Sequence, residues 1–420
     1  TEPPAMTAQP ATIPELLSAQ VAAQGDWPAL GVIVDGQLAW HTWNDLAAAL
    51  GPWRASLARL GVRPGDRVVQ VGANSLGWVL ADLAIQTLGA VHVPLHAALA
   101  PAQAAALIAH SGAVAALVES PALAEALGPL VPEGTVLQAL AEMPLADPGL
   151  DPGAAPPDPD ALTTILYTSG TTGPPRGVML SHRNLAANAV AVTEAARPTG
   201  DEVRLGLLPL SHIYARTCDL YVWLVHGGRL ALAERRETIF RDCQLAAPTA
   251  INGVPYFYQK VVDRLRQAGG ATDAAALRRA LGGAVRRCYC GGAALPPEVD
   301  RFFAERELPI LCGYGLTEAS PVVTATMPGE HRAGTVGRPL AGVRGRAGPC
   351  PAAWRHHRHR PCLALGGPGA GHLALGALGR ARPGRCGAGD GSGRLRCRSL
   401  RDQPRPAAGP GPDRPAGAVQ

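Results

Sequence analysis

The chain has 420 residues and a mass of 43.3 kDa, which is enough for two or three domains with a large buried core. Hydrophobic residues make up 47% of the sequence, which excludes a chain that is disordered throughout. The formal charge of +5 is unevenly distributed, because residues 344–420 contain 14 Arg and 3 Asp and carry +11, whereas residues 1–343 carry −6. The basic excess therefore lies entirely in the C-terminal segment.

The N-terminal part of the sequence predicts no export or membrane insertion. Residues 1–12 lack a basic region followed by an apolar stretch, so we expect a flexible terminus and no signal peptide. The nine cysteines have the spacing of neither a disulfide framework nor a zinc site, which favours a reducing, cytoplasmic location. Residues 83–118 contain no charged Asp, Glu, Lys or Arg, but three His and two Pro favour a buried strand–turn–helix over a membrane span.

Strand and helix patterns alternate through the first third of the chain. This alternation predicts an α/β fold with a parallel sheet covered by helices. The predicted helices are 42–60, 78–88 and 102–110, and the predicted strands are 67–72, 91–94 and 113–118. Residues 147–160 are rich in Pro, Asp and Gly and predict a linker. We therefore expect a first α/β subdomain at 13–146 and a second at 161–343.

The second subdomain opens with a candidate phosphate-binding loop. A buried strand at 163–168 leads into a Gly- and Thr-rich segment, followed by a strand at 178–180 and a helix from Ser181 or Asn184. Glycines let backbone N–H groups converge, hydroxyls add donors and Arg176 adds a positive charge, a combination that suits a polyphosphate. The segment is not a Walker A loop, and composition alone also allows a Gly/Thr hairpin turn. The candidate residues are Thr168, Ser169, Gly170, Thr171, Thr172, Gly173 and Arg176.

Two segments carry a resemblance to a known family. Residues 167–182 (YTSGTTGPPRGVMLSH) resemble the phosphate-loop signature of the acyl-adenylate-forming, or AMP-binding, enzymes. Arg176 stands where that family most often has Lys. Residues 208–217 (LPLSHIYART) resemble the segment that borders the acyl tunnel in fatty acyl-CoA synthetases. The resemblance places His212 at the carboxylate site, although a lone His is more often a core residue.

Two later segments match the family in the same order. Residues 290–296 (CGGAALP) resemble its glycine-rich strand end, so Gly291, Gly292 and Ala293 are expected to lie against adenine. Residues 312–321 (CGYGLTEASP) resemble its second signature. By resemblance, Tyr314 stacks on adenine, Thr317 contacts the α-phosphate and Glu318 binds Mg²⁺, and Gly313 and Gly315 also belong to the nucleotide site. An aromatic face, a hydroxyl and a hard carboxylate suit these partners, although Glu318 alone would be read as a solvated surface residue.

The resemblance covers residues 13–343 and then stops. It implies two packed α/β subdomains, while the family's β-barrel and mobile C-terminal domain are missing or replaced by residues 344–420, a low-complexity Arg/Gly/Pro/Ala-rich tail. The family's catalytic lysine is absent, because Lys260 is the single lysine of the sequence and lies in another region. We hypothesise that the reading frame shifts near Val343–Arg346 in a GC-rich gene. The alternative is a natural disordered basic tail.

The implied function is ATP-dependent activation of a carboxylic acid as an acyl-adenylate, followed by transfer to CoA. ATP, Mg²⁺ and CoA are the expected cofactors and co-substrates, and a long-chain fatty acid is the favoured substrate. We expect the activity of this chain to be impaired. The alternatives are an inactive nucleotide-binding fragment and an enzyme for another carboxylic acid. We expect no specific nucleic-acid partner and consider peripheral membrane association through a lipid substrate; the oligomeric state stays open.

Overall fold

The protein is described here from a computed structural model. The model describes residues 11–143, 151–154, 158–168, 176–269 and 272–343, and the backbone of Gly345–Gly348 and Cys362–Leu365. The predictions for residues 1–10, for most of the 147–160 linker and for most of the tail lie outside these residues. Thr12, placed in the flexible terminus, is the buried N-cap of helix α1 (Ile13–Gln24), where its hydroxyl accepts a hydrogen bond from the Glu15 N–H at 3.3 Å.

The first sheet has six strands in the order β6-β5-β3-β4-β7-β8. Their bounds are β3 (Arg67–Val71), β4 (Val91–Leu95), β5 (Ala115–Val118), β6 (Val136–Ala139), β7 (Leu162–Thr168) and β8 (Arg176–Ser181). Five strands are parallel, and β8 runs antiparallel to β7. A short 3-10 turn, Leu140–Glu142, follows β6.

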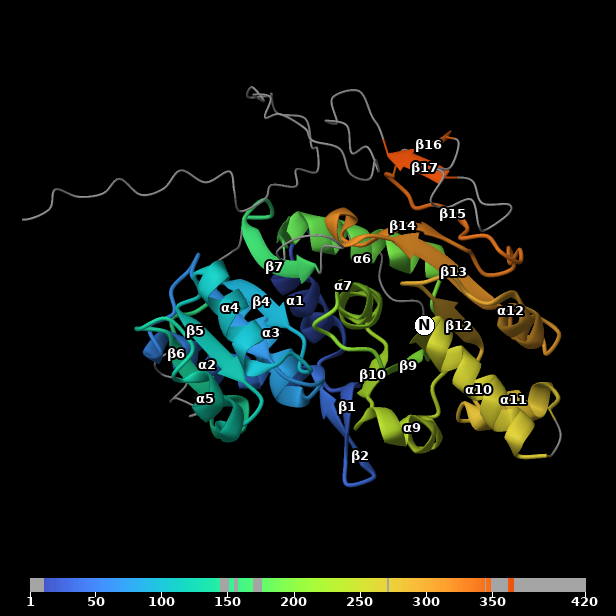
Figure 1. Cartoon of the computed structure of the whole chain (residues 1–420), viewed down its shortest axis with the longest axis horizontal. Helices are drawn as coiled ribbons and strands as arrows, with labels where there is room; N and C mark the ends of the chain where they lie inside the picture. Colours follow the sequence, from blue (N-terminus) through green and yellow to red (C-terminus); the bar gives the residue numbers. More distant parts are fainter. Residues whose placement is uncertain are drawn as a thin grey trace, which may run out of the picture.

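Helices cover both faces of this sheet, as Figure 1 shows. They are α2 (Trp43–Arg59), α3 (Leu76–Thr87), α4 (Pro101–Ser111) and α5 (Pro121–Leu127). Val68 packs in the cluster that contains α2 and α3, whereas Val69 and Val71 pack in the cluster that contains α4. This alternation follows from the two-residue repeat of a strand, and it explains why β3 has valines on both faces.

The second sheet has nine strands in the order β15-β14-β13-β12-β11-β9-β10-β1-β2. Their bounds are β1 (Pro28–Val34), β2 (Gln37–Thr42), β9 (Val203–Gly206), β10 (Arg229–Leu232), β11 (Ala250–Gly253), β12 (Arg287–Cys290), β13 (Ile310–Gly315), β14 (Val322–Ala325) and β15 (Arg338–Pro339). The strands from β13 to β1 are parallel, and β2, β14 and β15 are antiparallel additions at the two edges.

Helices on the two sides of the second sheet have different roles. One side packs against α9 (Ile239–Ala246), α10 (Pro255–Gln267), α11 (Ala274–Ala280) and α12 (Pro297–Ala304). The other side faces α1, α6 (His182–Ala196), α8 (Val222–His226) and the short helical turns before α8, which are α7 (Ile213–Ala215) and a π-helical turn (Arg216–Tyr221). The 3-10 turn Arg236–Thr238 precedes α9.

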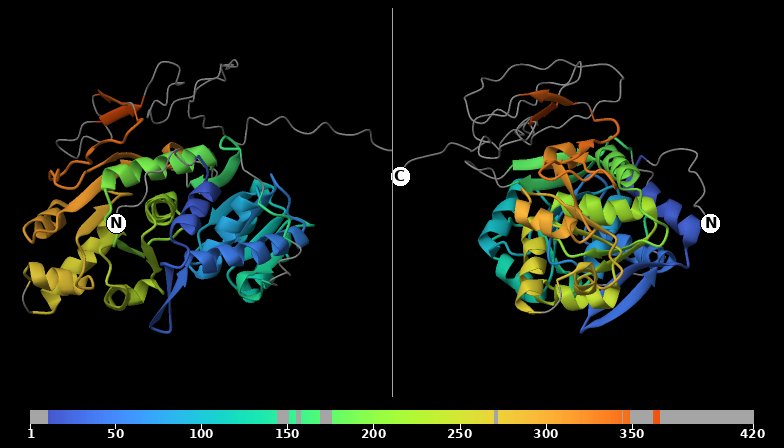
Figure 2. Two further views of the ribbon diagram at one scale, coloured as in Figure 1. Left: turned by 180° about the vertical axis from the view of Figure 1, so that it is seen from behind. Right: turned by 90° about the vertical axis from the view of Figure 1, so that its right-hand side faces the viewer.

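One hydrophobic cluster lies between the two sheets and joins them. It contains residues of α1, α2 and α3, together with Trp223 from α8 and Leu230 from β10. Trp43 and Trp223 stack with ring centroids 4.4 Å apart, and both are almost fully buried. The view from behind in Figure 2 shows α1 and α6 between the two sheets. The predicted architecture of two packed α/β subdomains is therefore confirmed.

The predicted elements correspond to observed ones, but no sequence pattern predicted the first two strands. The strand at 163–168 and the helix at 42–60, for example, correspond to β7 and α2. The hairpin of β1 and β2 was not predicted, and β1 pairs with β10 about two hundred residues later. The predicted linker lies between β6 and β7, which share one sheet, so it does not coincide with the division between the sheets. In the tail, β16 (Gly345–Gly348) and β17 (Cys362–Leu365) form a short antiparallel pair that the composition did not predict.

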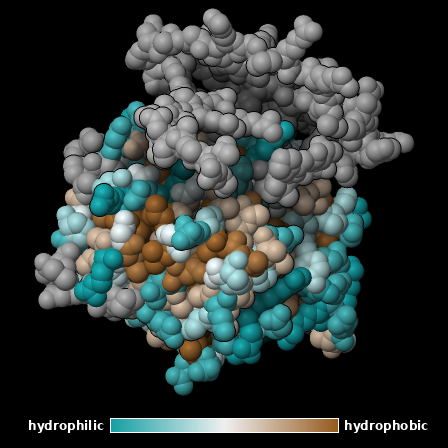
Figure 3. Space-filling view, turned by 60° about the vertical axis from the view of Figure 1, so that its left-hand side comes forward, coloured by the Kyte–Doolittle hydropathy of each residue, from teal (hydrophilic) through white to brown (hydrophobic). Residues whose placement is uncertain are grey.

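The charge-free stretch 83–118 is divided among α3, β4, α4 and β5, as the strand–turn–helix prediction required. Within the ranges described above, no helix combines the length and the apolar character needed to cross a membrane. Figure 3 shows apolar side chains gathered across the middle of one face, with polar side chains around them.

Candidate active site

The two strands that flank the candidate phosphate loop end side by side. β7 ends at Thr168 and β8 begins at Arg176, and these two residues are partners in the antiparallel ladder. Thr168 is half-buried and Arg176 is exposed. The positions predicted between them, Ser169, Gly170, Thr171, Thr172 and Gly173, lie outside the described residues. The structure therefore places the two ends of the loop.

A tight turn after β13 carries the second signature. The Leu316 N–H donates to the Pro321 carbonyl at 2.9 Å, and a 3-10 turn, Thr317–Ala319, follows. A Cβ atom at Gly315 would lie 2.2 Å from the Pro321 carbonyl oxygen, so only glycine fits there. Thr317 is half-buried at the start of the turn, and Glu318 is exposed.

Tyr314 and Glu318 lie close together in this turn. Burial raises the pKa of the Tyr314 phenol, and the nearby Glu318 carboxylate raises it further. The tyrosine therefore stays neutral at physiological pH, and the residue is half-buried. A half-covered aromatic face next to a solvent-exposed carboxylate can hold a flat base and a cation-bearing phosphate chain at the same time.

The two signatures meet although about 140 residues separate them. The turn Thr317–Ala319 lies next to β8. Asn188 of α6 fixes the approach, because its side chain donates to the Val322 carbonyl at 2.8 Å and accepts from the Val322 N–H at 3.1 Å. The Arg176 strand and the Glu318 turn therefore belong to one site, which joins the edges of the two sheets.

The segment that contains His212 also lies next to the turn that carries Glu318. The Tyr214 N–H donates to His212 Nδ1 at 3.2 Å, and the Thr217 hydroxyl donates to the Ser320 carbonyl at 3.3 Å. The Tyr214 ring packs over Gly291, where a Cβ atom would lie 3.1 Å from the ring. The His212, Gly291 and Glu318 segments thus lie next to one another, and the roles expected for these residues stay predictions.

Gly291 is covered by another side chain, whereas Gly292 is open. The Tyr214 ring lies over Gly291, and no sequence pattern predicted this contact. Gly292 has a φ of +80°, and the nearest atom to a Cβ placed there would be a Val254 methyl at 3.9 Å. Gly292 and Ala293 are exposed. An open, left-handed glycine lets a ligand approach the backbone closely, so adenine contact at Gly292 and Ala293 stays a prediction.

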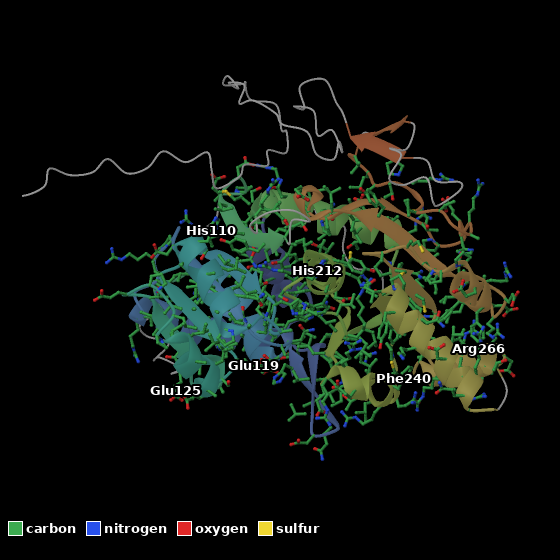
Figure 4. The ribbon with its side chains drawn as sticks, viewed as in Figure 1. His110, Glu119, Glu125, His212, Phe240 and Arg266 are labelled. Carbon is green, nitrogen blue, oxygen red and sulfur yellow. The ribbon has the colours of Figure 1, made fainter. Side chains whose placement is uncertain are left out.

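His212 is exposed beside α7 in the middle of the molecule, as Figure 4 shows. Surrounding protein atoms nevertheless lower the pKa of its imidazole by reducing its hydration, and His96 lowers it further. The ring is therefore neutral at physiological pH. A neutral imidazole next to an anion site can donate one hydrogen bond without trapping the anion as an ion pair.

A buried charged network behind the site was missed by the sequence analysis. Arg216 pairs with Asp82 of α3, and both side chains are fully buried. His92 Nδ1 of β4 lies 2.6 Å from Asp82 Oδ1 and 2.8 Å from Arg216 Nη2, and Arg216 Nη1 donates to the Thr164 hydroxyl at 2.8 Å. The Tyr221 hydroxyl donates to Asp82 at 3.2 Å. The sequence signal that could have revealed this network was Asp82, an acidic residue in the middle of an apolar helix.

The network has a clear charge state. Burial would raise the pKa of Asp82, but Arg216 and His92 hold it below its usual range, so the carboxylate is ionised. Burial and the Arg216 charge lower the pKa of His92 to about 4, so the imidazole is neutral. Arg216 and Asp82 thus form an ion pair that ties the π-helical turn to α3 and to β7, the strand that leads to Thr168.

A second buried group lies below the carboxyl ends of β11 and β12. Asp219 of the π-helical turn accepts a hydrogen bond from the Asn252 amide, which also donates to the Cys218 carbonyl at 2.9 Å. Arg204 donates to the same carbonyl at 2.7 Å and pairs with Glu202. Burial raises the pKa of Asp219 to about 7, although Arg204 and Asn252 oppose this shift. No partner for Asp219 Oδ2 is found among the described residues.

An aromatic ring, hydroxyls and a carboxylate thus lie at the carboxyl ends of parallel strands, which is where open α/β folds commonly bind ligands. The family model of the AMP-binding enzymes matches residues 17–346, and the chain belongs to this family. The match ends next to the change in composition after residue 343.

Curated relatives are acid–CoA ligases with different substrates. The chain is 31% identical to a feruloyl-CoA synthase from Amycolatopsis sp over 284 residues, covering 67% of this chain and 55% of that protein. It is 30% identical to a long-chain-fatty-acid–CoA ligase from Mycobacterium bovis, covering 70% and 58%, and 31% identical to a sulfoacetate–CoA ligase from Cupriavidus necator, covering 73% and 60%. The chain thus spans somewhat more than half the length of these relatives.

Solved structures share the fold. VinN has a TM-score of 0.69 at 20% identity, covering 80% of this chain and 83% of that one. ATP-bound MatB from Rhodopseudomonas palustris has a TM-score of 0.68 at 24% identity, covering 80% and 66%.

Proposed function

We propose that this chain carries the nucleotide-binding portion of an ATP-dependent acid–CoA ligase. The observation that carries the proposal is the convergence of three segments: the ends of β7 and β8, the turn with Tyr314 and Glu318, and the His212–Tyr214 segment. Such a site can bring ATP and a carboxylic acid together, so that the carboxylate attacks the α-phosphate, pyrophosphate leaves and an acyl-adenylate forms. Transfer of the acyl group to CoA would complete the reaction.

The proposed roles follow the chemistry of each group. Thr168 and Arg176 would hold phosphates together with residues 169–173, Thr317 would contact the α-phosphate, and Tyr314 would stack on adenine. His212 would border the reacting carboxylate. Gly291, Gly292, Ala293, Gly313 and Gly315 would shape the backbone around the nucleotide.

We expect Mg²⁺ to bind at this site only together with ATP. Among the residues described, no three His, Cys, Asp or Glu side chains are grouped so that they could hold a metal ion. Mg²⁺ commonly takes one or two carboxylates and completes its shell with phosphate oxygens and water. Glu318 supplies one exposed carboxylate at the right place, so it would hold Mg²⁺ on the ATP phosphates and reduce the repulsion between the two anionic reactants.

A long-chain fatty acid is our favoured substrate, because LPLSHIYART resembles that branch of the family and one curated relative acts on such acids. The relatives named for feruloyl-CoA and sulfoacetate make an aryl or a short sulfonated acid the main alternatives. Pyrophosphate exchange with palmitate, ferulate and sulfoacetate separates them. Exchange with ferulate alone would overturn the fatty-acid proposal.

The missing lysine predicts a slow reaction. Losing one preorganised charge contact typically costs about 10²–10³ in rate. A nucleotide-binding protein without ligase activity is therefore the second candidate, and ATP binding without pyrophosphate exchange would support it. Translation of the other frames of the nucleotide sequence after codon 343 is expected to give a T-G-D motif, whose aspartate holds the ribose in the family, and the catalytic lysine that the family carries in its C-terminal domain. Their absence would overturn the frameshift hypothesis.

The nucleotide site can be tested by calorimetric titration of Mg²⁺-ATP. Glu318→Gln should weaken binding about tenfold or more, because it removes the carboxylate from a site with few other ligands for Mg²⁺. Lys260→Ala is the matched control, because Lys260 lies on α10 with its ammonium over the Tyr256 ring at 5.4 Å. Equal losses in the two variants would refute the assignment. A cytoplasmic location, with membrane contact only through a lipid substrate, goes with this proposal.

A further inference from the structure

Two cysteines lie side by side at the carboxyl ends of neighbouring strands. Cys290 is the last residue of β12, and its register partner in the parallel strand β13 is Cys312. Their side chains are hydrogen-bonded to each other. Hydrogen-bonded strands lie about 4.8 Å apart, within the range of Cα separations of about 4.4–6.8 Å that a disulfide can bridge. The pair therefore has the placement that a cross-strand disulfide needs.

The other cysteines of this sheet region are placed differently. Cys288 lies two residues earlier on β12, is fully buried and pairs in register with Ile310. Cys312 is only partly buried, so a small solute can reach the pair through Cys312. Cys290 is 2% exposed and lies behind it.

Each cysteine of the pair directly precedes a segment of the candidate active site. Gly291–Ala293 follows Cys290, and Gly313–Gly315 follows Cys312. The Cα atoms of a disulfide are most often about 5.5–6 Å apart, against a strand spacing of about 4.8 Å, and its Cβ–S–S–Cβ dihedral is held near about 90°. Forming the bond therefore re-orients both side chains and changes the spacing of the two strand ends, and the glycines that follow are the residues best able to absorb the change.

We propose that Cys290 and Cys312 form an oxidisable dithiol, and that a hydroperoxide converts it into a disulfide that weakens nucleotide binding. The sulfur of Cys312 attacks the O–O bond of hydrogen peroxide, releases one water and becomes a sulfenic acid. The sulfur of Cys290 then attacks this sulfur, forms the S–S bond and releases the second water. Two thiols and one peroxide thus give one disulfide and two waters. The effect on binding rests on the function proposed above; the disulfide itself does not.

The environment of Cys290 sets the order of these steps. The hydrogen bond with Cys312 and burial raise the pKa of the Cys290 thiol far above its usual range. Since the thiolate is the reactive form, Cys290 is a poor first target, and its accessible neighbour reacts first. Oxidation is therefore slow compared with that of a low-pKa sensor cysteine, and a dithiol reductant reverses it.

Peptide mapping tests the modification independently of any activity. The full chain is treated with hydrogen peroxide, alkylated and digested with trypsin. The expected product links the peptide 288–301 to the peptide 307–332, and it disappears after dithiothreitol. Cys288→Ala should still give this product, which assigns the bond to Cys290, whereas Cys312→Ser and Cys290→Ser should not. Mapping is needed because the chain has seven cysteines besides this pair. Absence of the linked peptide in the unsubstituted chain would overturn the proposal.

Titration with Mg²⁺-ATP tests whether the disulfide weakens nucleotide binding. Each variant is compared with itself before and after peroxide. The unsubstituted chain and Cys288→Ala should bind about tenfold more weakly after oxidation, a change of ~1.4 kcal/mol, and should recover after reduction. Cys312→Ser and Cys290→Ser should show no change on oxidation. A linked peptide with unchanged affinity would refute control by the disulfide, whereas failure of the reduced protein to bind ATP would refute the proposed function instead.

Discussion

The buried pair of Arg216 and Asp82 makes a quantitative prediction about stability. Both side chains have no exposed surface, and the pair joins the π-helical turn to α3. Arg216→Met leaves the Asp82 carboxylate buried without its cation, and Asp82→Asn leaves the guanidinium buried without its anion. Removing one partner of a buried pair typically costs 3–5 kcal/mol, so we expect each change to lower the free energy of unfolding by about 4 kcal/mol.

Urea denaturation of the two single variants and the double variant measures the coupling. The double variant removes both charges together, so its loss should be smaller than the sum of the single losses by about 2 kcal/mol. Arg183→Met is the control, because Arg183 forms an exposed pair with Asp160 and its loss should cost less than about 1 kcal/mol. Additive losses at Arg216 and Asp82, or a cost no larger than that of the control, would refute the reasoning.

Three further outcomes follow from the structure. Gly315→Ala should reduce Mg²⁺-ATP affinity in titration, because a Cβ atom there meets the Pro321 carbonyl, whereas a Cβ atom at Gly77 in α3 would make only ordinary contacts at 3.9 Å, so Gly77→Ala should raise the melting temperature. Burial lowers the pKa of His182 to about 4, so this residue should contribute a loss of stability of about 3 kcal/mol as the pH drops from about 6.5 to 4. In urea titrations across this range, His182→Gln should reduce the total loss by that amount, while His92, whose pKa is also lowered to about 4, still contributes its own share. The pKa of Asp219 is raised to about 7, so it destabilises the fold as the pH rises from about 4 to 7, and Asp219→Asn should remove this loss in the same titrations. Unchanged pH profiles would contradict both assignments.

Local patterns were sufficient for most elements and for the outline of the site. The apolar, β-branched run at 163–168 predicted β7, because a strand buried on both faces needs no polar alternation. The roles expected for His212, Gly291 and Glu318 came from the resemblance of their motifs to the family's motifs. Tyr214 lying over Gly291 was not predicted, because a ring position depends on packing between segments that are far apart in sequence.

Pairings over long sequence distances were beyond local patterns. Arg216 had no visible partner in the sequence, since Asp82 lies 134 residues earlier. A charged residue in an apolar setting signals only that a partner exists, and topology decides which one it is. The linker predicted at 147–160 also rested on local composition. Composition marks a break in the chain, but it does not show which sheet each strand joins.

The pairing of β1 with β10 also constrains how the protein is made. All strands of the six-stranded sheet have been synthesised by residue 181, but β1 and β2 must wait until residue 232 before their parallel neighbour exists. At about 5–20 residues per second, a ribosome needs about 10–40 s to cover the two hundred residues between β1 and β10. During that interval the β1–β2 hairpin has an unpaired, apolar edge. The six-stranded sheet is therefore a unit that can form on the nascent chain before β10 exists, and β1 and β2, although synthesised before that sheet, are among the last strands to find their neighbours.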